Sequence, residues 1–228
     1  MTYAVIPAKG FRGAKQRLAA ILQPDERRLL AQSMLTDTLI ACSNATQLEG
    51  YGVVTSDTMV AEVATSCDAD VIWEPQAGGH SQAVSYAVHT CCQRGVTTLL
   101  TIPGDLPLIT PADIEAIVAP ANPLVSVILV PNRDELGTNA MVLSPPDCLP
   151  LQFGYDSFQR HLRLAAEHHL TIEVRRTPRV ALDIDEPEDL ARFAAQHPTC
   201  HSFRLLDDLG VLDRLAKIPI SPTQENLT

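Results

Sequence analysis

The sequence predicts one α/β domain with a mostly parallel sheet that helices cover on both faces. Short runs rich in β-branched residues alternate with longer stretches of helical periodicity, which is the pattern of successive strand–helix units. The strand-like run 124–131 is apolar almost throughout, as expected for a strand buried on both faces of its sheet. The chain has 228 residues, 46% of them hydrophobic, which is enough for a core without disulfides.

The alternation is regular as far as residue 131. Strands are expected at residues 3–7, 52–55, 71–74, 97–103 and 124–131. Helices are expected between them, at residues 24–43, after Asp57, and at residues 81–94 and 111–119. Pro24 and Pro111 suit the first turn of a helix, where no backbone N–H is needed. Thr110 is the expected cap of its helix, with Asp113 in the first turn.

The pattern loosens after residue 131. A polar loop (132–139), a short strand (140–144) and an irregular segment (145–154) precede a helix at 156–169, for which Asp156 is the expected cap. Strands at 171–176 and 180–185 follow, and then a helix that Pro187 opens.

No internal repeat or long flexible linker divides the sequence. We assign residues 1–197 to one domain and residues 198–228 to a C-terminal extension. Four leucines of the extension fall on one helical stripe: Leu205, Leu209, Leu212 and Leu215. The stripe docks either on the core or on a second subunit of a homodimer, and residues 219–228 are expected to be disordered.

The composition excludes several classes of function. A formal net charge of -10 argues against a nucleic-acid-binding face. No apolar run approaches the roughly 20 residues of a membrane span, and the N-terminus resembles a strand rather than a signal peptide. The six cysteines include no C-x-x-C pair, so zinc and redox motifs are not predicted. Cys91 and Cys92 are interpreted as small apolar residues rather than as a redox sensor. These features favour a cytoplasmic protein with small-molecule ligands.

A cationic segment follows the first strand. Lys9, Arg12, Lys15 and Arg17 lie within nine positions of an otherwise acidic chain, which points to an anionic ligand. The alternative is a solvated, basic start of a helix. That alternative is the weaker one, because the helix dipole disfavours positive charge at an N-terminus.

Carboxylates stand at the expected carboxyl ends of two strands, where open α/β sheets bind their ligands. Asp105 lies between Pro103 and Pro107, and Gly104 removes bulk beside it. Asp183 and Asp185 are alternate residues of a predicted strand, so they share one face at a separation of roughly 7 Å. Three carboxylates beside a cationic segment suit Mg²⁺ and phosphates. The alternatives are a turn hydrogen bond for Asp105 and a helix cap for Asp185.

Other catalytic signatures are missing from the sequence. There is no phosphate-binding P-loop, no dinucleotide-binding glycine fingerprint and no serine nucleophile elbow. The histidines lack zinc-binding spacing and are interpreted as structural or solvated. Two small-residue segments, 137–139 and 154–157, are candidate anion cradles in which backbone N–H groups, Thr138 and Ser157 are the donors. The alternative for each is ordinary turn-and-cap chemistry.

Together these segments resemble the 2-phospho-L-lactate guanylyltransferases. The resemblance rests on five segments in the family's order and covers about residues 3–195: 5–18, 103–108, 137–139, 153–161 and 182–190. It implies a GT-A-like nucleotidyltransferase fold and a role in making the deazaflavin coenzyme F-420. It also implies that GMP passes from GTP to a small phosphorylated acid, which is 2-phospho-L-lactate, phosphoenolpyruvate or 3-phospho-D-glycerate in different members.

The resemblance also implies roles for individual residues. Lys9 is expected to bind the nucleotide phosphates, and Arg12, Lys15 and Arg17 to assist it. The expected Mg²⁺ ligands are Asp105, Asp183 and Asp185, and the expected acceptor-binding residues are Thr138, Gly154 and Ser157. Three positions differ from the family's usual pattern. Gln82 replaces an asparagine near the base, Tyr155-Asp156 replaces Pro-Gly, and Glu186 replaces a threonine.

The implied reaction requires no general base. The acceptor's phosphate is already largely a dianion near neutral pH, so the difficulty is the repulsion between two polyanions, which Mg²⁺ and basic residues offset. A molybdopterin- or sugar-phosphate nucleotidyltransferase is the first alternative, although such enzymes expect a more glycine-rich first loop. The second is a regulatory module that binds a nucleotide without catalysis, which would have no use for three carboxylates.

Overall fold

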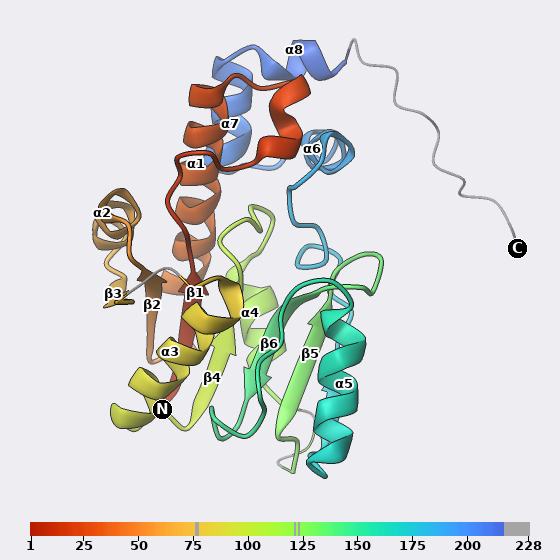
Figure 1. Cartoon of the computed structure of the whole chain (residues 1–228). Coiled ribbons are helices and arrows are strands. Elements are labelled where there is room, and N and C mark those ends of the chain that lie inside the picture. Colours follow the sequence, from red (N-terminus) through yellow and green to blue (C-terminus); the bar gives the residue numbers. More distant parts are fainter. Residues whose placement is uncertain (76–77, 121, 123, 217–228) are drawn as a thin grey trace, which may run out of the picture.

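The described residues form a sheet of seven strands, and it is mostly parallel as the sequence predicts. The computed structural model describes residues 1–75, 78–120, 122 and 124–216, and its strand order is β3-β2-β1-β4-β6-β5-β7 (Figure 1). The strands are β1 (Thr2–Pro7), β2 (Gly50–Thr55), β3 (Asp70–Trp73), β4 (Thr98–Thr101), β5 (Val127–Pro131), β6 (Thr138–Leu143) and β7 (Ile172–Val174). In the described chain only β6 runs antiparallel to its neighbours, β4 and β5. Strand β1 lies between β2 and β4, and its Val5 pairs with Gly52 and Thr101.

Helices cover both faces of the sheet, as expected. One face packs against α1 (Pro24–Ser43), α2 (Thr58–Ser66) and α4 (Pro111–Val118), where Ile6 and Leu100 meet Leu35 and Ile114. The other face packs against α3 (His80–Gln93) and α5 (Ser157–Glu167). There Val5 faces Val84, whereas Met141 lies in the cluster around Phe158. Successive residues of the central strands therefore bury opposite faces.

Local capping chemistry explains where several helices begin. The Asp57 carboxylate accepts the N–H groups of Met59 and Val60 at the start of α2. At α4, Asp113 N–H donates to the Thr110 hydroxyl and Thr110 N–H donates to the Asp113 carboxylate, which is the reciprocal pair of a capping box. Asp156 holds the cap position of α5, but its side chain makes no capping hydrogen bond.

The strand predicted at residues 180–185 is wrong. None of these residues pairs with the sheet. The Ile184 N–H donates to the Asp105 carbonyl, and the Val180 carbonyl accepts a hydrogen bond from the Asn139 side chain. The alternation that suggested a strand is nevertheless real, because Leu182 and Ile184 enter a buried cluster while Asp183 and Asp185 do not. Alternating burial shows which side chains point toward the core. It does not show that the segment pairs with a neighbouring strand.

Strand β6 begins two residues earlier than predicted and contains a bulge. Val130 pairs with Ala140, whereas Pro131 pairs with Thr138. Asn139 is therefore an extra residue with no partner in this ladder, and such a bulge redirects the side chain that it carries.

The chain after β7 forms a second packing layer on α1. It contains α6 (Pro187–Ala194), α7 (His201–Asp208) and α8 (Val211–Leu215), beside the short 3-10 helix η1 (Gln16–Ala20) (Figure 1). The Asp37 carboxylate of α1 accepts the His201 and Ser202 N–H groups at distances of 2.8 and 2.9 Å. All four leucines of the predicted stripe pack within one cluster of this chain. The prediction of disorder at 219–228 lies outside the described residues. No helix in the described ranges has the length and apolar character needed to span a membrane.

Candidate active site

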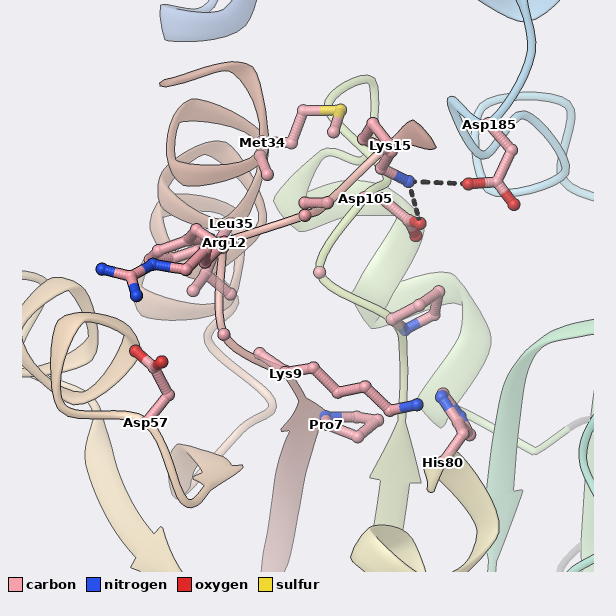
Figure 2. A pocket seen from close by; sticks show the side chains of 18 residues that line it. Pro7, Lys9, Arg12, Lys15, Met34, Leu35, Asp57, His80, Asp105 and Asp185 are labelled. Atoms are coloured by element: carbon pink, nitrogen blue, oxygen red, sulfur yellow. Dashed lines mark hydrogen bonds and ion pairs between the residues drawn. The ribbon is translucent and has the colours of Figure 1, made fainter. Parts of the chain in front are cut away.

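A cavity of about 610 Å³ opens at the carboxyl ends of β1 and β4. The loop from Ala8 to Lys15 forms one wall, and the loop from Pro103 to Asp105 forms another (Figure 2). A glycine suits the close approach of this second loop to the helical layer, because a Cβ atom on Gly104 would lie 2.9 Å from the end of the buried Leu35 side chain. The cavity therefore lies where ligands bind in open α/β sheets.

Lys15 lies between two of the predicted metal ligands. Its Nζ is 2.6 Å from Asp105 Oδ2 and 2.9 Å from Asp185 Oδ1, and its side chain is 9% exposed. Burial alone would lower the pKa of Lys15, but the charges of Asp105 and Asp185 raise it above its usual value. Lys15 is therefore an ammonium ion held by carboxylates. The alternative that Asp185 caps the next helix is wrong, because the cap residue of α6 is Glu186.

The other basic residues of the loop point in different directions. Lys9 extends toward His80 at the cavity wall, and Arg12 extends from the opposite side of the loop (Figure 2). Arg17 does not line this cavity. It pairs with Glu186 at 3.3 Å and lines a smaller polar pocket of about 190 Å³ that also contains Asp183 and Asp185. The basic residues of this segment therefore line two adjoining pockets: Lys9, Arg12 and Lys15 line the larger one, and Arg17 lines the smaller one.

Asp183, the third predicted metal ligand, is held by Asn139, the bulge residue of β6. Asn139 Nδ2 donates to Asp183 Oδ1 at 3.0 Å and to the Val180 carbonyl at 2.9 Å. Burial raises the pKa of Asp183 above its usual value, and the negative charges of Asp105 and Asp185 raise it further. Asp183 therefore lies in the same region as Asp105 and Asp185, although Asp183 and Asp185 belong to a loop and not to the predicted strand.

The carboxylates of this region have the chemistry of ligands for a hard cation. No three Asp, Glu, His or Cys side chains of the described ranges are arranged as a set of metal ligands. Asp105 Oδ1, however, is buried and has no hydrogen-bond partner among the described residues. A buried carboxylate oxygen without a partner is costly, and coordination to a divalent cation is one way to satisfy it.

The predicted acceptor residues Thr138 and Ser157 form a second cluster with His161. Thr138 N–H donates to Ser157 Oγ at 3.0 Å, and the Thr138 hydroxyl lies 3.0 Å from His161 Nδ1. Gln152 N–H donates to His161 Nε2. Because Nε2 accepts that bond, the proton of a neutral imidazole is on Nδ1 and is donated to Thr138. The Thr138 hydroxyl then keeps its own proton for another acceptor. Gly154 lies in the turn before Ser157 with a φ of 117°, a conformation suited to glycine.

The buried His161 predicts a specific pH dependence of stability. Burial, assisted by the charge of Arg160, lowers the pKa of His161 to about 4. The unfolded chain therefore binds this proton below about pH 6.5, whereas the folded chain does not. Between pH 7 and pH 4.5 we expect the wild type to lose about 2–3 kcal/mol more of its unfolding free energy than His161→Asn loses. Urea titrations at both pH values measure the difference, and equal losses in the two proteins would contradict it.

Several cavity residues escaped the sequence analysis. Asp57 was expected only to lead a helix, yet it lines the cavity, and a Cβ atom on Gly10 would clash with its Oδ2. His80 was interpreted as structural or solvated but lies at the cavity wall. Asn139 was assigned to an anion cradle, and instead it holds Asp183. Only long-range packing reveals these roles. Gln82 is not among the residues that line the cavity.

Solved structures of other proteins share this fold. A putative nucleotide-diphospho-sugar transferase from Desulfovibrio desulfuricans matches with a TM-score of 0.75 at 14% identity, covering 93% of this chain and 96% of that one. A cytidylyltransferase from Leptospira borgpetersenii matches with a TM-score of 0.60 at 14% identity, covering 96% and 98%. The fold is that of the nucleotidyltransferases.

Sequence similarity then identifies the family. Residues 2–216 match the family described as "Guanylyl transferase CofC like". The phosphoenolpyruvate guanylyltransferase of Conexibacter woesei is 38% identical over 190 residues, which are 83% of this chain and 85% of the relative. The 3-phospho-D-glycerate guanylyltransferase of Colwellia psychrerythraea is 34% identical over 193 residues, or 85% and 91%. The chain belongs to the CofC-like guanylyl transferases and is an enzyme of the nucleotidyltransferase class, which confirms the resemblance given by its motifs.

Proposed function

We propose that this enzyme transfers GMP from GTP to the phosphate of a small phosphorylated acid and releases diphosphate. The observation that carries the proposal is the meeting of a cationic loop with Asp105 and Asp185 at one cavity, with Lys15 between them. Asp183 lies in the adjoining pocket, which Asp185 also lines. Members of the same family that act on phosphoenolpyruvate and on 3-phospho-D-glycerate support it. The product, a GDP-capped acid, is proposed to serve the making of coenzyme F-420.

In this proposal the chain's own groups position two polyanions for an in-line transfer. Asp105, Asp183 and Asp185 would hold Mg²⁺, which supplies positive charge against the phosphates. Lys9 binds the phosphates of GTP from the cavity wall, with Arg12, Lys15 and Arg17 as further cations. The attacking oxygen belongs to the acid's phosphate, so catalysis rests on orientation and charge neutralisation.

The acid is proposed to bind where β6 meets the start of α5. The Thr138 hydroxyl is free to donate because His161 supplies the hydrogen bond that it accepts. Gly154 and Ser157 lie at the N-terminus of α5, and such a terminus favours anions. Asn139, adjacent to Thr138 in the chain, holds Asp183, so the acceptor site and the carboxylate cluster are joined by one strand.

A diphosphate-release assay with GTP, Mg²⁺ and each of the three acids tests the proposed function. We expect release with at least one acid, no release without an acid, and a GDP-capped acid in the mass spectrum. ATP in place of GTP should support a lower rate. Release that requires a sugar phosphate or a molybdopterin would support the first alternative instead, and binding of GTP with no release in any mixture would support the regulatory module.

Asp156 is expected to influence which acid is used. Its carboxylate lies beside the proposed cradle and pairs with Arg163 at 3.5 Å instead of capping the helix. It can accept a hydrogen bond from the hydroxyl of 3-phospho-D-glycerate, which the other two acids lack, and a lost polar partner discriminates strongly. We expect Asp156→Asn to lower kcat/KM for 3-phospho-D-glycerate relative to phosphoenolpyruvate about tenfold.

Two variants separate the charge of Asp156 from its backbone conformation. Its φ is 56°, a value that asparagine and glycine both tolerate. Asp156→Asn and Asp156→Gly should therefore shift the preference in the same direction. An unchanged ranking of the acids in both variants, with 3-phospho-D-glycerate inert throughout, would show that Asp156 does not select the acid.

A further inference from the structure

Lys15 occupies the position between the carboxylates to which the proposed function assigns a divalent cation. Its ammonium contacts Asp105 and Asp185 at 2.6 and 2.9 Å. Arg17, two residues away, instead pairs at 3.3 Å with the exposed Glu186. We propose that Lys15 is a built-in counter-cation of this cluster: it holds the site while no divalent ion is bound, and it moves to the nucleotide phosphates when Mg²⁺ and GTP bind. This inference rests on the proposed function.

Charge balance is the first argument for this role. Asp105, Asp183 and Asp185 bring three negative charges to one region, and no ion pair of the described residues reaches Asp183. A single ammonium therefore offsets the cluster only in part. Asp105 Oδ1 has no hydrogen-bond partner even with Lys15 beside Oδ2. A divalent ion brings more charge and can use the oxygen that Lys15 leaves unsatisfied.

The conformation of the loop is the second argument. Lys15 has a φ of 52° and Gly13 a φ of 75°. The left-handed region suits Gly13, but a lysine seldom adopts it. The ion pairs with Asp105 and Asp185 compensate for this conformation, so they also set the position of the loop. If the ammonium leaves the carboxylates, the loop can relax, and the long side chain can follow the phosphates of a nucleotide in the adjoining cavity (Figure 2).

Coupling between metal and nucleotide follows from this arrangement. A divalent ion that binds alone must displace Lys15 and leave its ammonium without a partner. With GTP present, the phosphates accept the displaced ammonium. Each ligand therefore strengthens the binding of the other, and reciprocity is a thermodynamic necessity. We expect the nucleotide-free enzyme to bind Mn²⁺, a spectroscopic substitute for Mg²⁺, weakly.

The test measures Mn²⁺ binding by electron paramagnetic resonance in the absence of any nucleotide. Lys15→Met removes the charge but retains a long apolar side chain, and it should bind Mn²⁺ at least about tenfold more tightly than wild type. Lys15→Arg retains the charge and should bind as weakly as wild type. Adding GTP should tighten Mn²⁺ binding in wild type more than in Lys15→Met. Equal Mn²⁺ affinity of Lys15→Met and wild type without GTP would overturn the counter-cation role.

A second measurement uses the wild-type protein and does not depend on how a variant folds. The chain has three lysines, Lys9, Lys15 and Lys217, so amine acylation followed by mass spectrometry reports each one separately. Lys15 should react slowly in the metal-free protein and faster when Mn²⁺ saturates the site without nucleotide, while the exposed Lys9 serves as the internal reference. A Lys15 rate that Mn²⁺ leaves unchanged would overturn the proposal.

The aspartate variants separate this inference from the proposed metal site. Asp105→Asn and Asp183→Asn should each weaken Mn²⁺ binding in the presence of GTP. If both bind Mn²⁺ as wild type does, the proposed metal site is wrong, and the role of Lys15 is wrong with it. If both weaken binding while Lys15→Met behaves as wild type, the metal site stands and only the counter-cation is excluded.

Discussion

Replacing Asp183 with asparagine is expected to lower kcat for GMP transfer at least about 100-fold, the scale of losing one preorganised charge at a reacting centre. The fold should survive the change. The asparagine carbonyl can still accept the hydrogen bond from Asn139 Nδ2, and the loss of a charge that burial and two neighbouring carboxylates disfavour relieves repulsion. We therefore expect the midpoint of thermal unfolding to stay the same or to rise.

Steady-state kinetics at saturating Mg²⁺, together with thermal unfolding, measure both parts of this result. Glu188→Gln is a matched control, because it removes one negative charge from the exposed first turn of α6 in the same segment. Its kcat should remain within about threefold of wild type. Wild-type turnover in Asp183→Asn would remove this residue from the catalytic centre.

Lys9→Ala is expected to lower kcat/KM for GTP about 100-fold while changing the KM of the acid much less. Among the described residues, no ion pair within 4.0 Å involves Lys9, whose side chain extends into the cavity toward His80 (Figure 2). Its charge is therefore available to the nucleotide. A charge-assisted hydrogen bond to phosphate contributes about 1.5–3 kcal/mol, and the upper part of that range corresponds to the expected loss.

Initial rates with each substrate varied separately distinguish the two effects. Lys9→Arg keeps a cation at the same position and should recover most of the loss. Equal losses for GTP and for the acid in Lys9→Ala, with no recovery in Lys9→Arg, would show that Lys9 supports the loop structurally instead of binding phosphate.

The sequence predicts best those helices and strands that are determined by residues close to one another in the chain. The helix at Pro24–Ser43 has the predicted bounds, and the helix at Pro111–Val118 begins where its proline and capping threonine place it. The periodicity of the apolar runs also leads to the correct sheet type. Asp105 and the cationic loop could be placed at one edge because parallel strands end together.

The remaining features of the site depend on contacts between segments far apart in the chain. Lys15 lies 90 residues from Asp105 and 170 from Asp185, so no local pattern shows that these residues pair. Alternation at 180–185 reflects burial against the helical layer of α6 and α7, and that signal resembles a strand. The Asn139 bulge leaves no mark in the sequence, because it is defined by the pairing partner of the strand.

The bulge at Asn139 restricts how this family can change its length. A deletion at that position would restore regular pairing between β5 and β6, but it would turn every side chain on one side of the deletion to the opposite face of the sheet. Either Thr138 would lose its hydrogen bond with His161, or the side chain of Met141 would leave the core. Insertions and deletions should therefore be rare in this strand among relatives. Changes of length are expected instead in the irregular segment before Gln152, whose N–H donates to His161. Members that accept acids of different sizes are expected to differ in that segment.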